Sequence, residues 1–132
     1  MKIYKWFEFD ASHRLNIDLL SKDENKEVFG KCNNTPSHGH TYKLKVVVEG
    51  RPNDYGMIIN YNDISKVVKP LIEILDHNFL NDLELFNSIP CTTTELMIQV
   101  LWDYLEPKLP GLYKLELKET DKTGCTYTGE MK

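Results

Sequence analysis

The sequence predicts an α+β fold built around an antiparallel sheet. Three observations predict this class. Two long segments of alternating apolar and polar residues open the chain, two stretches of helical periodicity fill its middle, and two shorter alternating segments close it. Strands and helices that come in groups favour an antiparallel sheet over a βαβ arrangement.

The size and composition of the chain fit one domain over residues 1–132. Hydrophobic residues make up 41% and charged residues 27% of the 132 positions, a balance that argues against disorder. The formal net charge of -4 disfavours a nucleic-acid partner, because neutralising phosphates needs a basic surface. We expect no membrane association, since no apolar run approaches the roughly 20 residues that span a bilayer.

Cysteine usage and the first residues predict the compartment. Three widely spaced cysteines make no disulfide framework, and the amino terminus lacks the apolar stretch of a signal peptide. We therefore expect a reduced, cytoplasmic protein. Cys91 and Cys125 show no partner pattern and receive no role.

The first half of the chain predicts two long strands. Residues 3–13 alternate as a half-buried strand does, with His13 at the end of the apolar face. Residues 38–49 repeat the pattern. The polar residues 17–31 between them predict a loop or a short helix. Turn residues follow the second strand, and a short strand is expected at 57–59.

Two helices are expected next. Apolar residues recur at helical spacing from Ile64 to Leu75, with Asn60 or Asn62 as a cap. Pro70 interrupts this pattern, which predicts a kink or a late helix start. The second helix is expected from Thr93 to Leu105.

The segment Thr92–Glu95 matches a capping box, Thr-x-x-Glu before an apolar helix. Strands at 113–119 and about 125–129 end the chain. In the first of them, Glu119 falls on the same side as the apolar residues Leu115 and Leu117. It is either solvated beyond the strand end or a carboxylate that awaits a flat ligand with adjacent N–H donors.

The histidines carry the strongest chemical signal. His38 and His40 lie two residues apart on the apolar face of their strand, and His13 lies on the apolar face of the other. Three imidazoles on one buried face suit a catalytic zinc with an open fourth position. The alternative is three histidines that are satisfied within the core or at the surface.

Cys32 and the pair Asp76-His77 offer further chemistry. A thiol near a zinc site can act as a base or nucleophile, serve as a fourth metal ligand, or be an inert buried group. Asp76 and His77 follow the first long helix, and the dipole at the end of a helix favours a histidine there. They can alternatively form a relay that takes a proton from Cys32.

Seven motifs in order resemble the 6-pyruvoyl-tetrahydropterin synthase family, which includes bacterial 6-carboxy-tetrahydropterin synthases. The similarity covers nearly the whole chain. The motifs are Phe9-Asp10-Ala11-Ser12-His13-Arg14, Phe29-Gly30-Lys31-Cys32-Asn33-Asn34, His38-Gly39-His40, Gly56-Met57-Ile58-Ile59-Asn60, Leu75-Asp76-His77, Thr93-Thr94-Glu95 and Lys118-Glu119-Thr120.

The resemblance implies a role for each candidate residue. His13, His38 and His40 are similar to the zinc ligands of the family. Cys32 is similar to its proton-abstracting thiol, with Asp76 and His77 as the relay. Glu119 is similar to the anchor of the pterin ring, with help from Thr93, Thr94 and Glu95.

The resemblance also implies a fold and an assembly. The family has the T-fold, a four-stranded antiparallel sheet with two helices on one face. Its subunits form barrels, usually homohexamers built as a dimer of trimers, with substrate sites between subunits. Zn²⁺ is the implied cofactor and a pterin triphosphate the small-molecule partner.

The implied activity is that of a lyase on 7,8-dihydroneopterin triphosphate. The five residues between Cys32 and His38 favour the product 6-pyruvoyl-tetrahydropterin. The segment from Leu75 to Asn81 is more similar to the branch that makes 6-carboxy-tetrahydropterin for queuosine and deazapurines. Leu96 departs from the Asn that many relatives carry there. A non-catalytic pterin-binding zinc module is the alternative of a different class.

Overall fold

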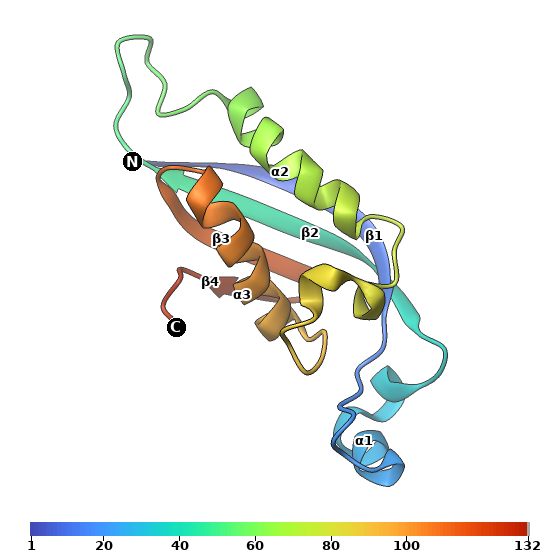
Figure 1. Ribbon diagram of the computed structural model, residues 1–132. Coiled ribbons are helices and arrows are strands. Elements are labelled where there is room, and N and C mark those ends of the chain that lie inside the picture. Colours follow the sequence, from blue (N-terminus) through green and yellow to red (C-terminus); the bar gives the residue numbers. More distant parts are fainter. Residues whose placement is uncertain (132) are drawn as a thin grey trace.

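A four-stranded antiparallel sheet forms the centre of the protein. The computed structural model describes residues 1–131, and Figure 1 shows the sheet with two long helices on one face. The strand order is β1-β2-β3-β4. The strands are β1 (Lys2–His13), β2 (His38–Glu49), β3 (Leu112–Thr120) and β4 (Thr123–Tyr127).

The helices divide into two groups. The long helices α2 (Tyr61–Leu75) and α3 (Thr94–Leu105) pack on the sheet, whereas α1 (Lys22–Phe29) lies beyond the ends of β1 and β2 (Figure 1). Four short 3-10 helices complete the chain: η1 (Gly30–Asn33), η2 (Leu80–Asp82), η3 (Glu84–Phe86) and η4 (Glu106–Lys108). The predicted α+β class is confirmed. Within the described residues, no helix is long and apolar enough to cross a membrane.

Strand alternation places the core between the sheet and the two long helices. The inward residues of β2 are fully buried against apolar residues of α2 and α3, as period-two and helical spacing require. β1 and β2 pair without a break from Lys2 opposite Glu49 to His13 opposite His38. This register fixes which side chains meet at the far end of the sheet.

The predicted strand at 57–59 is wrong, because these residues follow a turn at 53–56 and join no strand. The backbone N–H of Asn53 donates to the carbonyl of Met57 (2.9 Å), and the Asn53 side chain accepts from the Met57 N–H. Both backbone groups of Met57 are therefore used locally and cannot join a sheet.

The expected late start of the first long helix is also wrong. α2 begins at Tyr61, with Asn60 as the cap, and runs through Pro70. Pro70 is exposed, so its ring projects from the outer side of the helix. The last strand, β4, begins and ends two residues before the predicted 125–129.

The predicted capping box at Thr92 is wrong. The hydroxyl of Thr93 accepts from the N–H of Leu96 (3.3 Å), so the cap is one residue later. The Thr92 hydroxyl instead donates to Asn81 Oδ1 (3.2 Å) and lies 3.3 Å from Nδ1 of His13. Thr92 is thus part of the histidine cluster and unavailable to the helix.

Candidate active site

Three histidine side chains meet at the end of the sheet. His13 and His38 face each other across β1 and β2, and His40 projects from the same face of β2. One ring nitrogen from each lies within 4.8 Å of the others. The structure therefore brings together the three histidines that strand parity places on one face.

The donor set fits a zinc ion. His13 Nε2, both ring nitrogens of His38, and His40 Nε2 are buried and have no hydrogen-bond partner within residues 1–131. Leaving such a group unpaired costs about 1–3 kcal/mol, which a bound metal offsets. Tetrahedral zinc with Zn–N bonds of about 2.0–2.1 Å needs nitrogens about 3.3 Å apart, a small contraction of the cluster.

The burial of His13 prepares it as a ligand. Its Nδ1 lies 2.9 Å from the carbonyl oxygen of Thr92, so Nδ1–H donates and the Nε2 lone pair is free. Burial lowers the pKa of His13 from 6.5 to about 4, although the Thr92 carbonyl opposes this shift. His13 is therefore neutral at pH 7, the state that binds a metal.

Glu119 lies beside the histidines. Its Oε1 is 3.2 Å from Nε2 of His40, close enough for an ion pair but outside the directional geometry of a hydrogen bond. Burial lowers the pKa of His40 even though Glu119 opposes this. The carboxylate is about a quarter exposed, so it sits at the rim of the cluster with room for a ligand.

The pair Asp76-His77 is built on β1. Asp76 Oδ2 lies 2.9 Å from Nδ1 of His77. The backbone N–H of Asp10 donates to Asp76 Oδ1 (2.9 Å), and the Asp10 carbonyl accepts from the His77 N–H (2.6 Å). The Asp10 N–H first, and then His77, lower the pKa of Asp76. One strand residue thus holds both members of the pair.

His77 borders a cavity of about 540 Å³. His40, Thr41 and His77 are among its lining residues. His77 is 79% exposed and has a positive φ of 59°, a conformation that non-glycine residues seldom adopt. Its imidazole is held toward solvent at the edge of the sheet.

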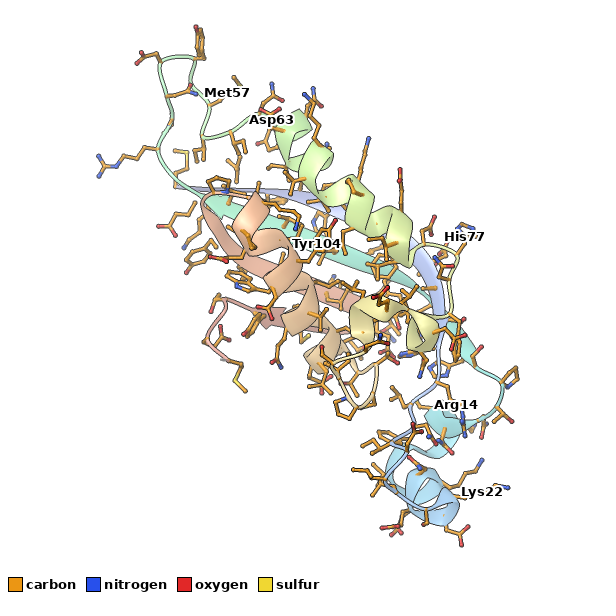
Figure 2. All side chains as sticks on the ribbon, viewed as in Figure 1. Arg14, Lys22, Met57, Asp63, His77 and Tyr104 are labelled. Atoms are coloured by element: carbon orange, nitrogen blue, oxygen red, sulfur yellow. The ribbon has the colours of Figure 1, made fainter. Side chains whose placement is uncertain are left out.

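Cys32 lies apart from this pair. Its carbonyl accepts from the Leu15 N–H (2.9 Å), whereas His77 is tied to Asp10. The two anchors, Leu15 and Asp10, lie five residues apart, a stretch that spans at most about 16 Å when extended. Figure 2 likewise shows His77 far from Lys22, where α1 begins.

The Thr93-Thr94-Glu95 segment starts α3. Thr93 caps the helix, and the Thr94 hydroxyl donates to Glu95 Oε1 (2.9 Å). In the described part of the chain, no hydrogen bond connects this segment to Glu119. Its neighbour Thr92 links it to His13 through the Thr92 carbonyl.

Comparison with known proteins decides the family. The sequence model described as 6-pyruvoyl tetrahydropterin synthase matches residues 2–130. The chain belongs to this family. It is therefore an enzyme, a lyase of the 6-pyruvoyl tetrahydropterin synthase type.

Individual members of the synthase family are similar over nearly their full length. The 6-pyruvoyl tetrahydrobiopterin synthase of Poecilia reticulata is 42% identical over 92% of this chain and 86% of the relative. The synthase of Homo sapiens is 39% identical over 98% of this chain and 92% of the relative. The solved Caenorhabditis elegans 6-pyruvoyl tetrahydropterin synthase has a TM-score of 0.92 at 32% identity, covering 98% of this chain and 96% of that one. The predicted T-fold is confirmed.

Sequence patterns missed three features of this synthase-family site. Thr92 orients His13, but its motif suggested a helix cap. Asn81 accepts from Thr92 and carries no local signal. The Tyr42 hydroxyl is buried beneath the histidines without a partner in residues 1–131, and its alternation with Leu44 indicated only core packing.

Proposed function

We propose that this protein is a zinc-dependent lyase that converts 7,8-dihydroneopterin triphosphate to 6-pyruvoyl-tetrahydropterin with loss of triphosphate, in tetrahydrobiopterin-type pterin biosynthesis. The observation that carries the proposal is the cluster of His13, His38 and His40, whose unpartnered nitrogens converge beside Glu119. The names of the curated relatives support the substrate and product. We further propose a single domain that acts in the cytoplasm.

The residues divide the chemistry between them. The three histidines would hold the zinc, which when bound lowers the pKa of the hydroxyl groups it contacts. Glu119 would accept the paired N–H donors along the edge of the pterin, a bidentate contact that fixes the ring. Thr93, Thr94 and Glu95 would support the substrate from the start of α3.

Proton transfer would use Cys32 and the Asp76-His77 pair. The Cys32 thiolate would take a proton from the pterin side chain, and the His77 imidazole would in turn exchange a proton with that thiol. Asp76 orients His77 through the 2.9 Å contact to Nδ1, which leaves Nε2 facing outward.

The separation of Cys32 from His77 supports an assembled site. Because the backbones of Cys32 and His77 are anchored five residues apart, at Leu15 and Asp10, we propose that Cys32 of one subunit meets His77 of a second copy. A homohexamer with sites between subunits would provide this meeting.

The test is to incubate the purified, zinc-loaded protein with 7,8-dihydroneopterin triphosphate and to identify the products by mass spectrometry. Formation of 6-pyruvoyl-tetrahydropterin and triphosphate is expected. Absence of triphosphate release would contradict the proposal. The Cys32→Ala variant, which keeps the histidines, is the matched control for uncatalysed breakdown.

The second candidate product is 6-carboxy-tetrahydropterin, formed with acetaldehyde for queuosine and deazapurine biosynthesis. The sequence from Leu75 to Asn81 favours it. Detection of the carboxy product would move the protein to that branch while leaving the site unchanged.

A further inference from the structure

A basic cavity of about 480 Å³ lies immediately beyond the histidine cluster. Arg14, Lys22 and Lys26 line it together with the chain that follows Cys32, and Asp23 is its one acidic lining residue. Arg14 is the neighbour of His13 in sequence, so the cavity opens one residue from the cluster. Figure 2 shows Arg14 and Lys22 together at the α1 end of the molecule.

Neutral oxygens hold two of the three cations, Arg14 and Lys26. Arg14 Nε donates to the carbonyl of Asn33 (2.8 Å), and Lys26 Nζ donates to Asn34 Oδ1 (2.7 Å). The Asn81 side chain also makes two hydrogen bonds to the Arg14 backbone: it accepts from the N–H (3.0 Å) and donates to the carbonyl (2.7 Å).

The three positive charges outnumber the one carboxylate of the lining, Asp23. No carboxylate within residues 1–131 lies within 4.0 Å of Arg14, Lys22 or Lys26. A guanidinium fixed through Nε leaves its two Nη groups free, the fork that binds phosphate oxygens in pairs. The ammonium of Lys26 uses one of its three donors. In a chain with a net charge of -4, this cluster is a local reversal of sign.

We propose that this cavity binds polyphosphate and, on the proposed function, receives the triphosphate of the substrate. The strand order supports the second part. Glu119 lies on β3, His40 on β2 and His13 on β1, followed by Arg14. Strands about 4.8 Å apart place Glu119 about 10 Å from the β1 side. A pterin held at Glu119 would have to extend by about this distance across the histidines to place its phosphates at Arg14.

The test is calorimetric titration of the full, zinc-loaded protein with inorganic triphosphate. The wild type is expected to bind it, and the double variant Lys22→Gln/Lys26→Gln to bind about tenfold or more weakly. Both lysines are exposed, and glutamine suits a helix equally well, so α1 should persist. Lys66→Gln is the matched control, because Lys66 is an exposed helical lysine on α2 that pairs with Asp63.

Two outcomes would overturn the proposal: no binding by the wild type, or equal affinity in the wild type and the double variant. A second titration compares 7,8-dihydroneopterin with its triphosphate. The double variant should lose affinity for the triphosphate alone, and an equal loss for both compounds would also contradict the site. Binding is measured without turnover, so the two proposals can fail separately. A protein that binds triphosphate but forms no product would contradict the proposed function and support the polyphosphate site.

Discussion

Oε1 of Glu119 lies 3.2 Å from Nε2 of His40. That nitrogen is buried and lacks a hydrogen bond, and it is the atom that His40 would give to a metal. The Glu119 carboxylate needs a proton on this nitrogen, whereas a metal needs its lone pair, so the two contacts exclude each other. We expect metal binding at His40 to release Glu119 toward a pterin, so that the two ligands favour each other.

The first prediction concerns Glu119. Glu119→Gln should weaken the binding of neopterin by about ten- to hundredfold, because an amide cannot accept two N–H donors as a carboxylate does. Zinc content should stay at that of the wild type. Calorimetric titration with neopterin measures the affinity, and metal analysis measures the zinc content. Glu116→Gln is the control, because Glu116 lies on the opposite face of β3. Unchanged affinity in the Glu119 variant would contradict its role as anchor.

The second prediction concerns pH and the metal-free protein. The pKa of His13 is about 4 in the folded state, against an ordinary value of 6.5 for histidine, so the unfolded state binds more protons between these limits. The contribution of His13 is complete above pH 6.5 and is lost as the pH falls toward 4. The loss in free energy of unfolding should reach up to about 3 kcal/mol, since each pKa unit is worth about 1.4 kcal/mol.

Urea denaturation in the presence of a chelator, at several pH values, measures this loss. His13→Asn is the control, because asparagine does not titrate and the slope due to residue 13 should vanish. Parallel pH profiles for the wild type and the variant would refute the assignment. If the variant does not fold, an NMR titration of the His13 ring in the wild type measures its pKa directly.

Local periodicity predicted most of the fold. Alternation in β1 and β2 is a property of neighbouring residues, and it placed His13, His38 and His40 on one face without knowledge of the pairing. The cap of α3 was not predictable in this way. Three successive threonines offer the same hydroxyl, and Thr92 is diverted by His13, which lies far away in sequence.

The relation between Cys32 and His77 was equally beyond local patterns. Each lies in a motif that suggests proton transfer, but their distance depends on where two loops meet β1. The turn at Asn53 shows the same limit on a smaller scale. Its side chain accepts from the amides of Tyr55 and Met57, and a strand at 57–59 would need the second of these.

The third prediction follows from that separation. Cys32→Ala and His77→Ala should each remove activity, because each takes one member from every shared site. When the two variants are dissociated, mixed in equal amounts and reassembled, about a quarter of the sites regain both residues by random mixing. Turnover assays before and after mixing check this.

Both variants retain the three histidines, so zinc content is the control for folding. Mixtures that stay inactive, despite exchanged subunits, would contradict a site shared between copies. Activity that survives in both single variants would contradict the proton-transfer roles of Cys32 and His77 altogether.

The most direct test of the histidine centre is the metal content of the wild type and of His38→Ala after reconstitution with zinc and dialysis. His38 is only partly buried, and both its nitrogens lack partners in the described chain, so the change should spare the fold. Circular dichroism checks this. We predict one zinc per chain in the wild type and loss of both zinc and lyase activity in His38→Ala. Stoichiometric zinc in the variant would contradict the centre formed by His13, His38 and His40.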